Sequence, residues 1–533
     1  MDLLGENLRP RTLLRSLSNA GRRRSSRTPP PPSIEERKHT LLLDLPSEVL
    51  QNIIVQMRPI DVLILRKTCT TLCAITRERR LWVALALRMV SHYGMPLAPS
   101  EREAMSISNL ERFATAPARS MRTMMAASLG KTSIWKRHPK LRPAREMTFK
   151  GVSIFSSAPQ SYINRYRMLL LPGGRYFLVA SWEGHIALCR IDDSGPVELA
   201  VSLFSERAAP GLERPLEQYA LCAYDVVEDG KVVRVATCAM AESFCEPWKF
   251  YIYDIELDAQ PPTFRLVAST RDLLRLFGPS SNVCLRGSRL AFADHYRTFV
   301  WDFARDRRVA WYDGRALGQT DKLRLTRNPG KDLPQERVVD TTMDPVQTEE
   351  SSVATMLCVY EWPADAEGVL GGIVFPSLTL CLSADQLLHL PQRVPIGTRF
   401  VFHVQSRMPD GDHVMHAYEL ADDLEQTRRS WAHLTVDPTF GADIFASAPS
   451  GTVLVNECDV GQVAVERCSE DFMIHTTWAD SRGQRLMGAT LKMVSPTTSS
   501  SWRFDKQSFD PISGRLCAFR GRDHTLAVVD YIV

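Results

Sequence analysis

Only a few groups of residues in this 533-residue chain have types and spacings that could support chemistry. The Gly-Lys-Thr run at 130–132 resembles the end of a phosphate-binding loop, but the glycine needed five positions earlier is replaced by Met125. No β-rich run precedes it either. His413 and His416 fall in a predicted strand, where a spacing of three places side chains on opposite faces. They are not expected to share a metal ion.

Other patterns that would indicate catalysis are also missing from the sequence. There is no H-E-x-x-H and no G-x-S-x-G motif. The paired acids Asp192-Asp193 and Asp422-Asp423 stand in polar turns, where solvated, turn-capping carboxylates are usual. The sequence therefore predicts a protein that is not an enzyme, with no cofactor and no metal site.

Twelve cysteines are spread through the chain, and none forms a Cys-x-x-Cys pair. Cys69 and Cys73 fall in a predicted helix, where a cysteine usually serves as a small buried hydrophobe. Reduced thiols are typical of a reducing compartment, so we expect the cytoplasm, the nucleus or both. No stretch approaches the roughly 18 apolar residues of a membrane span or resembles the apolar core of a secretory signal.

The balance of charge argues against nucleic acid as the partner. Apolar residues make up 44% of the chain and charged residues 24%, as in ordinary soluble globular proteins. The formal net charge is +4, but seven arginines lie within residues 1–28, against Asp2 and Glu6. The rest of the chain is close to neutral, and a nucleic-acid-binding protein normally carries its basic surface on the folded part.

The first 40 residues are predicted to be a disordered basic and proline-rich tail. An arginine- and serine-rich cluster at 22–27 is followed by four prolines at 29–32. Such a segment cannot bury enough apolar surface to offset the entropy lost on ordering. The cluster is either a solvated basic arm, or it belongs to a tail that directs nuclear import or is controlled by phosphorylation.

Residues 41–90 show the apolar period of short helices. Pro46 suits the first turn of a helix, Pro59 interrupts it, and Asp61 favours the start of a second helix. A third helix is expected to include Leu81-Trp82. Apolar residues of the first helix are Leu45, Val49, Leu50, Ile53, Ile54 and Met57. A three-helix unit of this size buries little apolar surface, so it is expected to need a partner.

Residues 91–150 are predicted to be a mostly helical linker, in which Ser100 could cap a helix that reaches Phe113. From 151 to 533 the apolar period falls to two. Turn signals such as Pro172-Gly173-Gly174 separate β-rich runs, and hairpins are expected within 176–191, 397–420 and 515–532. The segment 151–533 is therefore predicted to be all-β.

An irregular repeat runs through the predicted β region. An apolar residue followed by an acid recurs about every 56 residues, which suits a four-stranded propeller blade. The acids are Asp192, Asp254, Asp302, Glu361, Glu419, Glu466 and Asp530. The predicted fold class is multidomain α+β: a small three-helix unit, a helical linker and an all-β domain, interpreted as a β-propeller of about seven blades.

The helical unit resembles the F-box motif. That motif opens with Leu-Pro, continues through an apolar helix and an Asp-Leu-Leu-like step, and closes with Leu-Trp. The matching residues here are Leu45-Pro46, Val49-Leu50, Ile53-Ile54, Ile60-Asp61-Val62-Leu63, Arg66, Cys69 and Leu81-Trp82. The remainder is similar to the divergent WD-like propeller of fungal F-box proteins, through 172–176, Trp301-Asp302 and the ending 513–531.

The resemblance implies a substrate-recognition adaptor of a Skp–cullin–F-box ubiquitin ligase. The helical unit would bind a Skp-family adaptor and, through it, a cullin, while the β domain would present loops to a target protein. The residues expected to contact the adaptor are Leu45, Pro46, Leu50, Ile53, Leu63 and Trp82. Two alternatives remain: a propeller scaffold acting outside ubiquitin ligases, and nucleic-acid binding through the basic stretches at 22–27 and 131–145.

Overall fold

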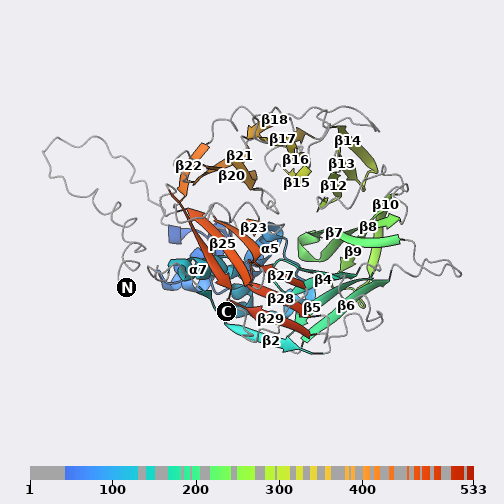
Figure 1. Ribbon diagram of the computed structural model, residues 1–533. Helices are drawn as coiled ribbons and strands as arrows, with labels where there is room; N and C mark the ends of the chain where they lie inside the picture. The colour runs from blue at the N-terminus through green and yellow to red at the C-terminus, as the bar shows by residue number, and fades with distance from the viewer. Residues whose placement is uncertain are drawn as a thin grey trace, which may run out of the picture. The chain divides into compact units, whose positions relative to one another are not determined.

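The computed structural model describes residues 42–129, 140–150 and, between 166 and 532, the strands with some of their turns (Figure 1). For residues 309–507 it describes the backbone pairing only. The predicted tail 1–40 and the run 130–132 lie outside the described residues. By its internal contacts the chain divides into two compact units, Met1–Ile53 and Ile54–Val533.

Short helices occupy the described part of the chain before residue 130. They are the 3-10 turn η1 (Leu42–Asp44) and the α-helices α2 (Ser47–Gln56), α3 (Pro59–Leu65), α4 (Thr70–Ile75), α5 (Arg79–Tyr93), α6 (Pro99–Ala104) and α7 (Ile107–Leu129). The predicted helices are present. The apolar period and the two prolines therefore predicted these helices correctly.

Several helix ends differ from the predictions in detail. Pro59 starts α3, and Asp61 lies in its first turn, 2.6 Å from the guanidinium of Arg58. Cys69 precedes α4, and its sulfur accepts a long hydrogen bond (3.5 Å) from the backbone of Leu72. Ser100 does not cap a long helix, because α6 ends at Ala104 and a separate helix begins at Ile107.

The β region is a propeller whose described strands form seven groups of four, here called blades. Blade 1 is β3 (Tyr166–Leu170), β4 (Tyr176–Ser181), β5 (His185–Asp192) and β6 (Gly195–Leu203). Blade 2 is β7 (Glu217–Val227), β8 (Val232–Ala241), β9 (Lys249–Glu256) and β10 (Phe264–Thr270). Blade 3 is β11 (Val283–Arg286), β12 (Arg289–Ala293), β13 (Arg297–Asp302) and β14 (Arg307–Tyr312).

The later blades follow the same antiparallel order. Blade 4 is β15 (Thr320–Arg327), β16 (Glu336–Asp344), β17 (Ala354–Glu361) and β18 (Leu378–Leu382). Blade 5 is β19 (Gln386–His389), β20 (Phe400–Arg407), β21 (His413–Leu420) and β22 (Trp431–Val436). Blade 6 is β23 (Val453–Leu454), β24 (Gly461–Cys468), β25 (Asp471–Ala479) and β26 (Arg485–Met493). Two parallel residue pairs between β22 and β26 join blades 5 and 6.

Blade 7 is completed by a strand from much earlier in the chain. Its first three strands are β27 (Lys506–Asp510), β28 (Arg515–Arg520) and β29 (Thr525–Asp530). The fourth, β2 (Arg145–Phe149), pairs antiparallel with β29, and β27 contacts β3 of blade 1 (Figure 1). A short strand β1 (Lys140–Leu141) pairs with β26. Two strands of the β region therefore lie inside the predicted linker 91–150, because strand pairing so distant in sequence leaves no local signal.

The core of the propeller lies between successive blades. Apolar side chains of blade 7, including Cys517 and Val528, pack against side chains of blade 1 such as Phe177. A second cluster joins blades 1 and 2, and a third joins blade 2 to blade 3 through stacked rings of Phe250 and Phe292. Blades 1 and 2 are thus apolar on both faces, as expected for stacked blades.

Six of the seven acids in the predicted repeat lie on the third strand of a blade; Glu466 is on the second strand of blade 6. Among the blades whose side chains are described, three have the acid paired across the sheet with an arginine of the second strand. The pairs are Arg234–Asp254 (2.6 Å), Arg289–Asp302 (3.5 Å) and Arg515–Asp530 (2.5 Å). All three carboxylates are buried, so the repeat marks a structural ion pair.

The segment from α5 to α7 packs on one edge of the propeller. The Leu97 amide donates to the carbonyl of Gly230 (2.9 Å) in the η4 turn (Glu228–Gly230), which joins β7 and β8. The Ser120 hydroxyl donates to the carbonyl of Pro511, in the turn between β27 and β28. The edge that carries the turns between first and second strands is therefore covered by these helices in blades 2 and 7.

Replacing Gly230 by alanine is expected to lower the free energy of unfolding by about 2 kcal/mol or more. A methyl group there would lie 2.6 Å from Cγ1 of Val90 and 3.1 Å from the Met95 carbonyl, at φ +90°. Gly287→Ala is the matched control, since Gly287 also has positive φ (+54°) with no atom within 4 Å. Equal shifts in thermal unfolding of the two variants would contradict the close approach.

Candidate adaptor-binding site

Exposed apolar side chains are concentrated in the first helices. Nine large apolar side chains are exposed among the described residues, and five of them lie between residues 42 and 64. They are Leu42, Leu43, Val49, Ile53 and Ile64. Exposed apolar side chains often mark a contact with another protein, which makes these residues candidates for one.

Helix α2 carries two adjacent apolar stripes with different roles. Leu50 and Ile54 are 3% and 2% exposed, so they belong to the interior. Val49 and Ile53, one residue earlier in each turn, are 41% and 44% exposed. A helix that needed only to bury one face would not repeat apolar residues at both positions. The second stripe is therefore available to a partner.

The residues predicted to contact the adaptor fall into three groups. Pro46 and Ile53 are exposed, Leu45 and Leu63 are half-buried, and Leu50 and Trp82 are buried. Their contact with an adaptor stays a prediction for all six. Val49, Leu42, Leu43 and Ile64 are also exposed and were not among the predicted contacts, although the doubled apolar positions of the first helix were a usable signal.

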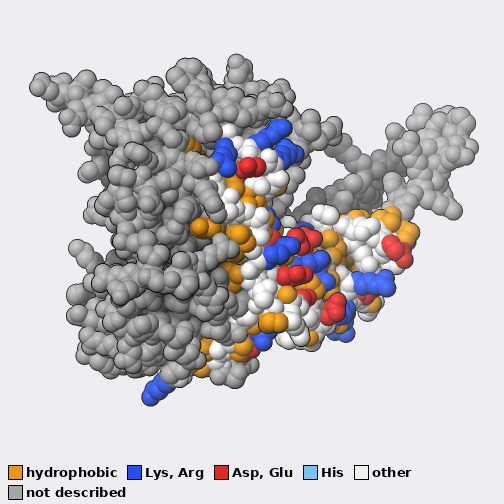
Figure 2. Space-filling model, turned by 90° about the vertical axis from the view of Figure 1, so that its right-hand side faces the viewer, with side chains coloured by type: hydrophobic (Ala, Val, Ile, Leu, Met, Phe, Trp, Pro, Cys, Tyr) orange, Lys and Arg blue, Asp and Glu red, His pale blue; other side chains and the backbone are white. Residues whose placement is uncertain are grey.

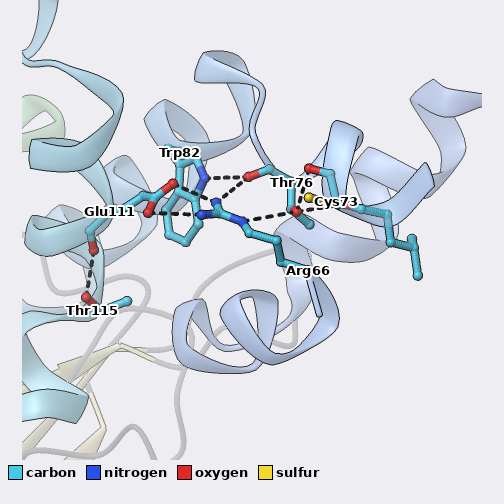
Figure 3. Close-up of polar contacts among 7 residues, drawn as sticks. Arg66, Cys73, Thr76, Trp82, Glu111 and Thr115 are labelled. Carbon is cyan, nitrogen blue, oxygen red and sulfur yellow. Dashed lines mark hydrogen bonds and ion pairs between the residues drawn. The ribbon is translucent and has the colours of Figure 1, made fainter. Parts of the chain in front are cut away.

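Trp82 is the centre of the helical unit's interior. Its side chain is fully buried, and the indole Nε1–H donates to the carbonyl of Thr76 at 2.8 Å (Figure 3). The guanidinium of Arg66 lies 5.6 Å from the centre of the indole ring. This position gives Trp82 a role in holding α4 and α5 together.

Arg66 connects the end of α3 to three other helices. Its guanidinium makes a two-pronged ion pair with Glu111 of α7, at 2.6 and 3.2 Å, and donates to the carbonyl of Thr76 at 2.7 Å (Figure 3). The Thr115 hydroxyl donates to the Glu111 backbone carbonyl at 2.7 Å. Both partners of the ion pair are only about one-fifth exposed, so the pair is shielded from water. Glu111 carried no signal in the sequence.

A second arginine closes the end of α2. Arg88 of α5 donates to the backbone carbonyls of Val55 and Met57, which are left without helical partners where α2 ends. Burial, and to a smaller extent the positive charge of Arg88, lowers the pKa of His92 to about 4. His92 is therefore neutral at physiological pH.

The described residues hold no grouping of histidine, cysteine and acidic side chains suited to a metal ion. Among those same residues, no helix is long and apolar enough to span a membrane. On the face shown in Figure 2, basic and acidic side chains of the described residues are intermixed. That face does not carry the one-sided basic surface typical of nucleic-acid binding.

Together these features define a small helical unit followed by a β-propeller. Residues 42–84 match the family model described as the F-box domain. The chain therefore carries an F-box domain, followed by a β region of four-stranded antiparallel sheets. No curated protein matches the chain.

Solved propellers resemble the chain distantly. The β-propeller domain of Cps50 (Swd1) from Myceliophteria thermophila is 12% identical, with TM-score 0.35, over 69% of this chain and 95% of that one. The WD40 domain of Pan2 from Neurospora crassa is 8% identical, with TM-score 0.35, over 74% and 94%. The WD40 domain of SCAP from fission yeast is 9% identical, with TM-score 0.33, over 69% and 84%. The propeller assignment rests on the strand order of this chain.

Proposed function

We propose that this protein is a substrate-recognition adaptor of a Skp–cullin–F-box ubiquitin ligase. An F-box implies a Skp-binding adaptor role, and a propeller is a common platform for protein interaction. The observation that carries the proposal is the exposed apolar stripe on α2 within that F-box. The protein acts through binding, and catalysis of ubiquitin transfer belongs to the enzymes that the cullin recruits.

The two edges of the propeller have different parts in this proposal. The helices α5 to α7 contact turns in blades 2 and 7 on one edge, which leaves less room there for a target. The opposite strand ends include the carboxyl ends of β4, β8 and β28. The target is proposed to bind at this opposite edge, whose connections lie outside the described residues.

Replacing Ile53 by aspartate in the full chain is expected to weaken binding to a purified Skp-type adaptor by about 30-fold or more. A carboxylate at this position would be desolvated without a partner when the adaptor covers α2. Binding is measured by calorimetry with the purified full-length protein. Replacing Pro46 or Val49, which are also exposed in the F-box, is expected to weaken adaptor binding by a smaller factor.

Leu266→Asp is the matched control, since Leu266 on β10 is also 44% exposed but lies outside the F-box. It is expected to bind the adaptor as the unmodified protein does. Equal losses for both variants would show a general effect of added charge. Failure of the unmodified, folded protein to bind any Skp-type adaptor would overturn the proposal and favour a scaffold outside ubiquitin ligases.

A further inference from the structure

The short helix α6 contacts the propeller through polar groups of Ser100 and Glu101. None of its six residues is buried. The hydroxyl of Ser100 donates to Asp258 Oδ1 at 2.5 Å, and its backbone amide donates to Oδ2 at 3.1 Å. Asp258 lies in the turn between β9 and β10 of blade 2. Glu101 lies 3.4 and 3.6 Å from the guanidinium groups of Arg175 and Arg190 in blade 1.

Asp258 caps the N-terminal end of α6, although it lies far from that helix in the sequence. Its carboxylate accepts hydrogen bonds from both the free amide of the first turn and the hydroxyl of Ser100. The sequence Ser100-Glu101-Arg102-Glu103 could also indicate a capping box within α6. In the structure, however, the hydroxyl is directed to blade 2 and Glu103 is exposed, so that box is not the contact made.

The same four residues have the pattern that acid-directed serine kinases recognise. Such kinases select a serine followed by acids at the first and third positions, here Glu101 and Glu103. The Ser100 side chain is exposed, and no residue of α6 is fully buried, although the Glu101 side chain is only 12% exposed. Opening of α6 into the extended form that a kinase requires breaks the contacts of Ser100 and Glu101 with the blades, and those of Arg79 with the carbonyls of Arg102 and Glu103.

We propose that Ser100 is a phosphorylation site whose modification releases α6 from blade 2. The kinase transfers the γ-phosphoryl group of ATP to Ser100 Oγ; an O–P bond forms, the hydroxyl proton leaves to the kinase's base, and ADP departs. The product carries a charge of about −1.5 to −2 at neutral pH and has lost the donor hydrogen. It would face the Asp258 carboxylate at the 2.5 Å separation that the hydrogen bond now spans.

Phosphorylation thus acts on the open form of α6 and prevents its return. Repulsion from Asp258 blocks reclosure of the Ser100 contact, and Glu101 loses the geometry that places it beside Arg175 and Arg190. The remaining attachments of the helical segment to the propeller, at Gly230 and Pro511, are untouched. The modification loosens one of several contacts and leaves the F-box itself folded.

The test treats the purified full-length protein with casein kinase II and ATP, with Ser100→Ala as the control. Phosphate is expected on Ser100 by mass spectrometry, and amide hydrogen exchange across 101–104 is expected to become about tenfold faster. Absence of phosphate at Ser100 in the intact protein would overturn the proposal. So would modification that leaves exchange of this segment unchanged.

A charge-swap series separates electrostatic release from simple loss of the hydrogen bond. Ser100→Glu is expected to speed exchange across 101–104 more than the uncharged Ser100→Gln, because only the first opposes the carboxylate of Asp258. Adding Asp258→Lys to Ser100→Glu is expected to restore slow exchange. Equal effects of glutamate and glutamine, or no rescue by the lysine, would overturn charge repulsion as the mechanism.

Discussion

Replacing Trp82 by alanine will unfold the F-box helices and abolish adaptor binding, at a cost of about 3–5 kcal/mol in the free energy of unfolding. The side chain is fully buried, donates its N–H to Thr76, and lies beneath the guanidinium of Arg66. Its removal leaves a cavity between α4 and α5 that short helices have little means to fill. The change is followed by urea unfolding and by limited proteolysis of residues 42–90.

Trp82→Phe is the control that keeps most of the volume and removes only the donor. Thr76 retains a second donor, the guanidinium of Arg66 at 2.7 Å, so its carbonyl is not left unsatisfied. The expected loss is therefore about 1 kcal/mol, with adaptor binding preserved. An alanine variant that unfolds at the same urea concentration as the unmodified protein would contradict the assignment of Trp82 to the interior.

This result would also separate the two ways of losing adaptor binding. Ile53→Asp is expected to abolish a contact while the helices stay folded, because Ile53 is exposed. Trp82→Ala is expected to abolish the structure that presents the contact. A proteolysis pattern that changes for the tryptophan variant but not for the isoleucine variant distinguishes them.

Replacing Phe149 by aspartate will destabilise the propeller by about 3 kcal/mol or more. Phe149 is on β2, and its side chain packs against the apolar cluster between blades 7 and 1. The substitution places a carboxylate in that cluster. It also weakens the pairing of β2, which among the described strands is the outer neighbour of β29. The loss is measured as a fall in the thermal unfolding midpoint of the full chain.

Thr148→Asp provides the control on the same strand. Thr148 is exposed, because alternate residues of β2 face away from the cluster. A shift of less than about 0.5 kcal/mol is expected for it. Equal destabilisation by both substitutions would show that β2 tolerates no charge on either face, and would contradict the role assigned to Phe149.

Local patterns in the sequence predicted much of the fold. The helices of 41–90 follow from the apolar period and from two prolines, and hairpins such as β4–β5 and β28–β29 follow from turn residues between β-rich runs. The acid repeat reflects the blade period, because six of its acids lie on third strands and three of them pair with an arginine of the neighbouring strand. In each case the cause lies within one blade or one helix.

What could not be predicted depends on contacts between distant parts of the chain. Glu111 meets Arg66 across 45 positions, and β2 meets β29 from opposite ends of the β region. The division of apolar residues into buried and exposed was also hidden. Val49 and Leu50 are equivalent in type, and only packing makes one exposed and the other buried.

The origin of β2 gives the protein a particular order of assembly during synthesis. Its partner β29 is made roughly 380 residues later, which at typical elongation rates is a delay of about 20–75 s. Throughout that interval the helices can form from local contacts. The strand β2 has already been made, but the strand β29, with which it pairs, has not. We therefore expect the nascent chain to hold β2 unpaired until β29 emerges, so that blade 7 is completed late in folding.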